Sequence, residues 1–165
     1  MDLFNDFGNG KIDLMLVDDS RDILELSEMV LDRENNDFSV HSTTDPDEVL
    51  ESFNGCELDA IISDYDMPQM TGIELLEEVR EVDQDFPFIL YTGKGTEEIA
   101  VDAINAGVTD YFQKEAGTEH YSLIANSVEN SVSRYRDSER SQVLREVVEK
   151  SDNPIVVTNT DSEIV

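Results

Sequence analysis

Acidic side chains stand directly after two short apolar runs of the sequence. Asp18 and Asp19 follow the run IDLMLV, and Asp64 follows DAIIS, with Asp66 two residues further on. Like charges that share one cleft repel one another, and a hard divalent cation with oxygen ligands, Mg²⁺ above all, relieves that repulsion. If Asp18, Asp19 and Asp64 converge in the fold, we therefore expect them to form a magnesium site.

Two further side chains suit the same cleft. Thr92 follows the apolar run FILY and offers a hydroxyl donor, and Lys114 follows DYFQ and offers a point charge for a phosphate oxygen. A carboxylate nucleophile, Mg²⁺, a lysine and a hydroxyl together form a site for phosphoryl transfer, here onto Asp64.

Each of these residues also has a simpler interpretation. Paired aspartates after a strand often begin a helix, with Asp19 or Ser20 as its cap. An Asp-x-Asp motif is common in so acidic a chain, Thr92 stands beside glycines that favour a turn, and Lys114 alone could be a solvated lysine. The combination of all these residues at one edge of one sheet favours the functional interpretation.

The elements that would position these residues alternate along the chain. Apolar runs such as LMLV and AII are continuous, which is typical of strands covered on both faces, and amphipathic segments separate them. A capping box at Thr71-x-x-Glu74 and the pair Asp45-Pro46 mark helix starts. This order predicts an α/β fold, a doubly wound five-stranded parallel sheet with helices on both faces, which binds ligands at the carboxyl ends of its strands. The predicted strands are residues 12–17, 38–42, 59–63, 88–91 and 110–113.

The composition limits the environment and the partners. The chain has 165 residues, of which 39 are acidic and 11 basic, for a net charge of -28. Such acidity suggests a protein from a salt-adapted organism and speaks against direct binding of nucleic acid by this segment. No apolar run approaches the ~20 residues of a membrane span, and the N-terminus lacks the pattern of a signal peptide. We expect a cytoplasmic protein without a membrane partner.

The motifs LVDDS, SDYDMPQMTG, YTG and DYFQK, in this order, resemble the receiver domain of two-component response regulators over roughly residues 11–135. The pattern Asp-x-x-Met-Pro-x-x-x-Gly from Asp64 to Gly72, with paired acids upstream and a lysine downstream, is highly specific as a set. The resemblance implies a flavodoxin-like sheet with strand order 2-1-3-4-5 and Mg²⁺ as the cofactor. It also implies a histidine kinase or phosphotransfer protein as partner.

The resemblance further implies roles around the metal. Asp64 would be the phosphoacceptor and would take the phosphoryl group from a kinase phosphohistidine. Asp19 would bind Mg²⁺ directly and Asp18 mainly through water, and the backbone carbonyl of Asp66 would be a further ligand. Asp66 and Lys94 flank the site, and we hypothesise that they pair and restrict access of water to the phosphoryl group.

The resemblance also implies a switch. Thr92 would be the hydroxyl that moves to the phosphoryl group, Lys114 the lysine that pairs with it, and Tyr111 the rotating aromatic residue. Together they would shift the face formed by the fourth helix, fifth strand and fifth helix. A homodimer is plausible through this face or through the C-terminal helix. The sequence departs from the family at Gly93, where a small residue such as alanine is usual, and at Glu115, where proline is common.

The predicted domain organisation has four parts. Residues 1–9 form an N-terminal tail, 10–137 the receiver domain, 138–152 a helical linker and 153–165 the truncated start of a second domain. The stretch LREVVEKSDNPIVVTNTDSEIV resembles the lead-in of a PAS sensor domain, which implies a multidomain signalling protein with a downstream PAS, kinase or output domain. The receiver domain would catalyse only its own phosphorylation and dephosphorylation, whereas the full-length protein could be a histidine kinase.

A phosphatase is the alternative enzyme. Phosphatases of the haloacid-dehalogenase type also use a strand-ending Asp-x-Asp with Mg²⁺, which Asp64 and Asp66 superficially match. That family places the motif after its first strand with Thr or Val two residues on, whereas Pro68 stands here. It also leaves Asp18 and Asp19 without a role. An interaction module with an inert acceptor site is harder to reconcile with a complete set of site residues.

Overall fold

The computed structural model describes residues 11–55, 57–93 and 95–149. The predicted N-terminal tail, residues 153–165 of the predicted second domain and Lys94 therefore lie outside the described residues. Strands and helices alternate as the sequence predicts. The elements are β1 (Ile12–Val17), α2 (Arg21–Glu34), β2 (Phe38–Thr43), α3 (Pro46–Asn54), β3 (Ala60–Ser63), α4 (Gly72–Val82), β4 (Phe88–Thr92), α5 (Glu97–Asn105), β5 (Asp110–Gln113) and α6 (Tyr121–Glu149).

The five strands form one parallel sheet in the order β2-β1-β3-β4-β5. This confirms the doubly wound, flavodoxin-like fold with strand order 2-1-3-4-5. The predicted bounds of β2, β3 and β4 are off by one residue at one end. In β4 the reason is that Thr92 still pairs with Gln113 of β5, so the ladder extends to the residue assigned to the site.

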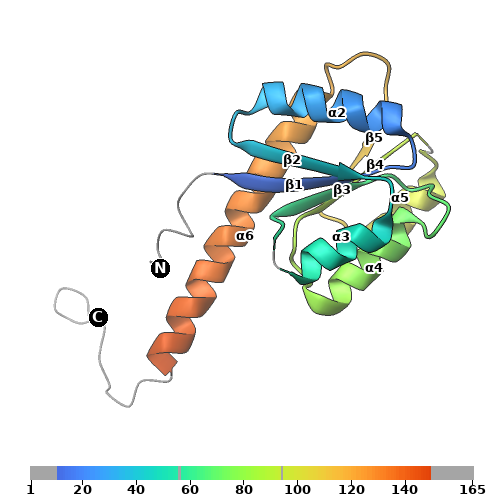
Figure 1. Ribbon diagram of the computed structural model, residues 1–165. Coiled ribbons are helices and arrows are strands. Elements are labelled where there is room, and N and C mark those ends of the chain that lie inside the picture. Colours follow the sequence, from blue (N-terminus) through green and yellow to red (C-terminus); the bar gives the residue numbers. More distant parts are fainter. Residues whose placement is uncertain (1–10, 56, 94, 150–165) are drawn as a thin grey trace. The chain divides into compact units, whose positions relative to one another are not determined.

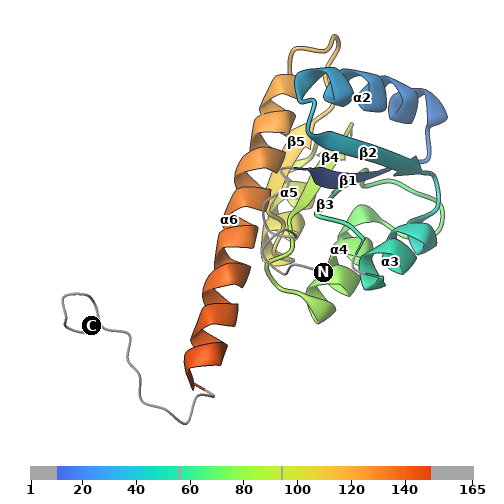
Figure 2. The ribbon, with the colours of Figure 1, turned by 60° about the vertical axis from the view of Figure 1, so that its left-hand side comes forward.

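Helices cover both faces of the sheet (Figures 1 and 2). Helix α2 and residues 121–133 of α6 lie on one face, and α3, α4 and α5 lie on the other. All four residues of β3 are buried, because the strand is central and covered on both sides, which explains why its sequence is apolar without alternation. On the second face, the rings of Phe53 and Phe86 meet edge to face with their centroids 4.9 Å apart.

The helix starts that the sequence marks are present. At α4 the Thr71 hydroxyl accepts from the backbone N–H of Glu74, and the Glu74 side chain accepts from the N–H of Thr71, which completes the capping box. Asp45 caps α3, whose first residue is Pro46, and Ser20 caps α2. Helices α2 and α3 thus begin shortly after β1 and β2, whereas the longer segment 64–71 separates β3 from α4 at the carboxyl edge of the sheet.

The chain divides into two units, Met1–Ser133 and Arg134–Val165. The sheet belongs to the first unit. In the second, residues 134–149 continue α6, and four large apolar side chains are exposed there: Val143, Leu144, Val147 and Val148. The expected helical linker is thus helical as far as Glu149, while the domain boundaries themselves remain predictions. None of the helices in the described part of the chain is long and apolar enough to cross a membrane.

Candidate functional site

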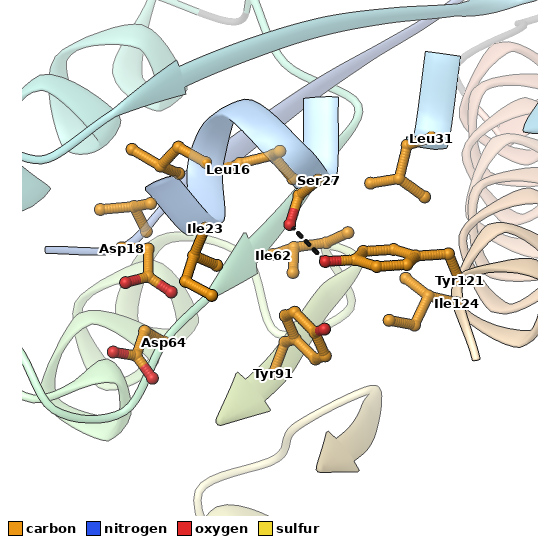
Figure 3. A pocket seen from close by; sticks show the side chains of 12 residues that line it. Leu16, Asp18, Ile23, Ser27, Leu31, Ile62, Asp64, Tyr91, Tyr121 and Ile124 are labelled. Carbon is orange, nitrogen blue, oxygen red and sulfur yellow. Dashed lines mark hydrogen bonds between the residues drawn. The ribbon is translucent and has the colours of Figure 1, made fainter. Parts of the chain in front are cut away.

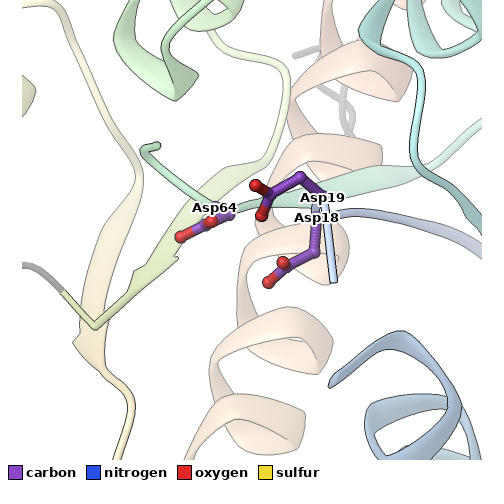
Figure 4. A group of neighbouring side chains, drawn as sticks. All are labelled: Asp18, Asp19 and Asp64. Atoms are coloured by element: carbon purple, nitrogen blue, oxygen red, sulfur yellow. The ribbon is translucent and has the colours of Figure 1, made fainter. Parts of the chain in front are cut away.

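The sheet ladder brings the three predicted carboxylates together. The backbone N–H of Asp64 donates to the carbonyl of Val17 at 2.9 Å, so Asp64 extends the pairing of β3 with β1 by one residue. Asp18 and Asp19 follow Val17 directly. One carboxylate oxygen from each of the three aspartates lies within 4.8 Å of the others, and Figure 4 shows the side chains gathered at this edge of the sheet.

Crowding and burial shape the electrostatics of this cluster. Asp18 and Asp64 are only 4% and 6% exposed, whereas Asp19 lies open to solvent. Loss of surrounding water and the neighbouring charge of Asp18 raise the pKa of Asp19 above its ordinary value. Oxygen ligands on three converging carboxylates are the donor set that Mg²⁺ prefers. Asp18, Asp19 and Asp64 therefore fit a divalent metal ion.

Lys114 offsets part of this negative charge. Its Nζ lies 2.6 Å from Asp18 Oδ2 and 3.3 Å from Asp64 Oδ1. Its backbone N–H donates to the carbonyl of Thr92 at 2.9 Å, so the β4–β5 ladder fixes where the side chain starts. Burial alone would lower the pKa of Lys114, but the hydrogen bond and charge of Asp18, with the charge of Asp64, outweigh it and raise the pKa. Lys114 is therefore held as a cation beside Asp64.

The other predicted residues lie around this centre. Thr92 is fully buried as the last residue of β4. Tyr111 lies in β5, and its hydroxyl is buried without a hydrogen-bond partner within the described residues. Burial also raises the pKa of Tyr111. Asp66 is exposed in the loop after β3, and its carbonyl ligand role, like its pairing with Lys94, remains a prediction.

Gly72 explains one fixed position of the Asp-x-x-Met-Pro-x-x-x-Gly motif. A Cβ atom at this residue would lie 2.2 Å from the carbonyl oxygen of Asp64. The N–H of Gly72 donates to the carbonyl of Tyr65 at 2.8 Å, which closes the loop that follows Asp64. The Ser63 hydroxyl donates to the same Asp64 carbonyl at 2.8 Å. The main chain at Asp64 is thus held closely from two sides.

A small cavity lies beside the carboxylates. Its lining is mostly apolar and includes Asp18, Asp64 and Tyr91, and Figure 3 shows the hydrogen bond between Ser27 and Tyr121 along its wall. The space amounts to about 10 Å³, which is enough for about one water molecule. Binding pockets for small molecules are usually about 300–1,000 Å³. This cavity is therefore too small for an organic substrate, and a reacting group must approach from the open edge of the sheet.

Sequence reasoning missed two residues that adjoin the site. The Tyr91 hydroxyl lies 2.6 Å from His120 Nε2, and Lys114 Nζ lies over the Tyr91 ring, 5.7 Å from its centroid. Tyr91 precedes Thr92 inside the apolar run FILY and is typical there of a core aromatic residue. His120 directly precedes the first residue of α6. The only signals in the sequence were that Tyr91 adjoins Thr92 and that His120 adjoins the start of α6.

Comparison with known proteins agrees with the resemblance seen in the sequence motifs. The family model for the response regulator receiver domain matches residues 14–125. The response regulator SaeR of Staphylococcus epidermidis is 27% identical over 131 residues, which cover 79% of this chain and 56% of that protein. This chain thus spans about half the length of the curated relatives it matches.

Solved structures share the fold. The CheY-like receiver domain protein from Methanospirillum hungatei JF-1 has a TM-score of 0.67 at 22% identity, over 78% of this chain and 98% of that one. The signal receiver domain of an HD domain-containing protein from Pseudomonas fluorescens Pf-5 has a TM-score of 0.69 at 24% identity, over 81% and 94% of the two chains. At these identities the likeness extends to the fold.

Proposed function

This chain belongs to the response regulator receiver domain family, and from that premise we propose that Asp64 is its phosphoacceptor. The observation that carries the proposal is the position of Asp64, buried beside two other carboxylates with Lys114 Nζ at 3.3 Å. A carboxylate oxygen of Asp64 would attack the phosphorus of a phosphohistidine, forming an acyl phosphate while the imidazole leaves. The donor would be a histidine kinase or a phosphotransfer protein.

Asp18, Asp19 and Asp64 would hold Mg²⁺, with the carbonyl of Asp66 as a further ligand. When bound, the ion supplies charge neutralisation for the phosphoryl oxygens and for the crowded carboxylates. Lys114 already bridges Asp18 and Asp64. On phosphorylation it would leave Asp18 and pair with a phosphoryl oxygen, which keeps the added negative charge compensated.

The switch would start at Thr92 and Tyr111. Thr92 is buried next to the site, and the Tyr111 hydroxyl is buried without a partner in the described part of the chain. A buried unsatisfied hydroxyl costs about 1–3 kcal/mol, so a small change at the site suffices to rotate the ring. The proposed output face is α5, β5 and the start of α6, where Val101, Ile104 and Leu123 are more than half exposed.

The same proposal extends to the partners of the domain and to its cellular setting. The output face, or the exposed apolar part of α6 that begins at Val143, would be the contact of a homodimer. Downstream in the full protein we propose a PAS, kinase or output domain, and we propose a cytoplasmic, salt-adapted setting from the net charge of -28. Direct contact of this segment with nucleic acid is disfavoured by the same charge.

The haloacid-dehalogenase alternative is not favoured. Its motif would follow the first strand, whereas Asp64 follows β3, the third strand in sequence. Asp18 and Asp19 lie in the same cluster as Asp64 and would be redundant in that mechanism. The matched family model is also that of the receiver domain.

Phosphorylation of the purified chain tests the proposal. We expect acetyl phosphate to phosphorylate the protein, and beryllofluoride to bind it, only when Mg²⁺ is present. The variant Asp64→Asn should do neither. The matched control Asp32→Asn, which removes an exposed carboxylate on α2, should behave as the wild type. Equal binding of beryllofluoride by Asp64→Asn, or binding that ignores Mg²⁺, would refute the assignment.

A further inference from the structure

One side chain holds both ends of the loop that joins β5 to α6. This loop begins with Lys114 and ends with His120, just before α6. Lys114 Nζ lies over the face of the Tyr91 ring, 5.7 Å from the centroid, and His120 Nε2 lies 2.6 Å from the Tyr91 hydroxyl. Because Tyr91 is in the ladder of β4, its ring ties both loop ends to the sheet.

The Tyr91 ring is itself held by a packed cluster. The ring centroids of Tyr91 and His120 are 5.7 Å apart, those of His120 and Tyr121 are 4.6 Å apart, and those of Tyr91 and Tyr121 are 5.8 Å apart. All three side chains are buried, and the Tyr121 hydroxyl reaches Ser27 of α2 at 2.8 Å. Rings that are buried and in mutual contact have few alternative rotamers. The ring under Lys114 is therefore a fixed surface.

The hydrogen bond between Tyr91 and His120 orients both partners. Burial raises the pKa of Tyr91 well above its ordinary value, so its hydroxyl keeps its proton. His120 is 8% exposed, and its Nδ1 has no hydrogen-bond partner among the residues that the structure describes. The bond to Tyr91 is then the polar contact that sets the orientation of the imidazole, and through it the end of the loop.

We infer that Tyr91 and His120 are positioning residues for Lys114. A lysine side chain has a flexible four-carbon stem, and the carboxylates hold Lys114 only from one side. The Tyr91 ring supplies a second contact, by attraction of the cation to its face, and His120 keeps that ring and the loop in place. The inference rests on the proposed function, because Lys114 has a phosphoryl group to meet only if Asp64 is the acceptor.

Three single variants and one double variant test this positioning in phosphorylation by acetyl phosphate at saturating Mg²⁺. Tyr91→Phe keeps the ring and loses the hydroxyl, and His120→Leu loses the nitrogen that meets it. We expect each to slow phosphorylation of Asp64 by about threefold to tenfold, the range that follows from losing one ordinary hydrogen bond. The double variant should be no slower than the slower single variant. His120→Gln, whose amide can replace Nε2, should stay within about twofold of the wild type.

Tyr121→Phe is the matched control. It removes the buried hydroxyl that is bonded to Ser27 and keeps the ring that packs against Tyr91. We expect it to lower the midpoint of thermal unfolding while phosphorylation stays within about twofold of the wild type. If Tyr121→Phe slowed phosphorylation as much as Tyr91→Phe, the cluster would act only through stability, and the inference would fail.

A spectroscopic readout separates this inference from the proposed function. In the unphosphorylated protein, the Hε resonance of Lys114, assigned by its loss in Lys114→Arg, should be shifted by the Tyr91 ring current. Tyr91→Leu should move it toward the value of a free lysine, and Tyr121→Phe should leave it in place. An unchanged resonance in Tyr91→Leu would overturn the positioning role, even if Asp64 is phosphorylated. A wild-type protein that takes no phosphoryl group would overturn the proposed function instead.

Discussion

Replacement of Gly72 by alanine tests how closely the chain packs around Asp64. The new Cβ would lie 2.2 Å from the carbonyl oxygen of Asp64 and 2.8 Å from Leu90 Cδ1. Real Cβ atoms essentially never approach another heavy atom within 3.0 Å, so something must shift. The Asp64 carbonyl belongs to the main chain and is held by the Ser63 hydroxyl at 2.8 Å. This carbonyl cannot shift without moving Asp64.

Two effects of opposite sign determine the result. Overpacking of a well-filled site costs about 1–3 kcal/mol. Alanine is a better helix former than glycine by about 1 kcal/mol in a helix interior, and Gly72 is only the first residue of α4, where the gain is smaller. We therefore expect the free energy of unfolding to fall by about 1–2 kcal/mol. The affinity for Mg²⁺ should fall as well, since Asp64 is displaced.

Denaturant unfolding and a Mg²⁺ titration by calorimetry measure the two effects. Gly55→Ala is the matched control, because the new Cβ would lie 3.3 Å from Glu57 Oε2, the end of a flexible side chain, and farther from all else. We expect it to change the free energy of unfolding by less than about 0.5 kcal/mol and to leave Mg²⁺ binding unchanged. If Gly72→Ala matched Gly55→Ala in both measurements, the reasoning from close approach would be refuted.

Two other substitutions probe the charge balance and the opposite edge of the sheet. Asp19→Asn removes one of three crowded carboxylates, so without divalent ions the free energy of unfolding should rise by about 0.5–1 kcal/mol. Calorimetry should show weaker Mg²⁺ binding. An ion-free variant that is less stable than the wild type would contradict the repulsion between the carboxylates. Arg80 donates to the carbonyls of Gly107 and Asp83 at 2.9 and 3.1 Å and to the Thr109 hydroxyl at 3.3 Å. Arg80→Ala should therefore lower the free energy of unfolding by about 2–3 kcal/mol. Arg80→Lys should recover only part of this loss, because an ammonium group cannot reproduce the forked geometry of the guanidinium. A loss below about 1 kcal/mol in Arg80→Ala would contradict this role.

The sequence was sufficient to predict the fold and the centre of the site. Continuous apolar runs identified strands buried on both faces, and parallel strands place the residues after their ends at one edge of the sheet. The convergence of Asp18, Asp64 and Lys114 follows from that rule, because each stands immediately after a strand. The predicted end of β4 was one residue short, because apolarity was used to place it, whereas the pairing of Thr92 with Gln113 decides where the strand ends.

Contacts across the fold could not be predicted in this way. Tyr91 lies inside an apolar run, where a core tyrosine and a platform for a lysine have the same local pattern. Its partner His120 is 29 residues away, and Tyr121 meets Ser27 across 94 residues. Such pairs depend on how α6 and α2 lie on the sheet, and no local spacing encodes that arrangement. The role of Gly72 was visible as a motif position, but its close approach to Asp64 was not.

The hydrogen bond from the Asp64 N–H to the Val17 carbonyl extends the β1–β3 ladder one residue past the end of β3. The position of the Asp64 side chain therefore depends on correct strand register. Val17 pairs with Ser63, and Asp64 takes the next position. A slip of one residue would bring Ser63 or Tyr65 to that place and turn the apolar side chains of the strand to the wrong faces. A misregistered molecule would therefore lose its core packing and the position of the proposed acceptor Asp64 together. If Asp64 is the acceptor, as proposed, the fraction of molecules that take up a phosphoryl group measures the fraction that has folded in the correct register.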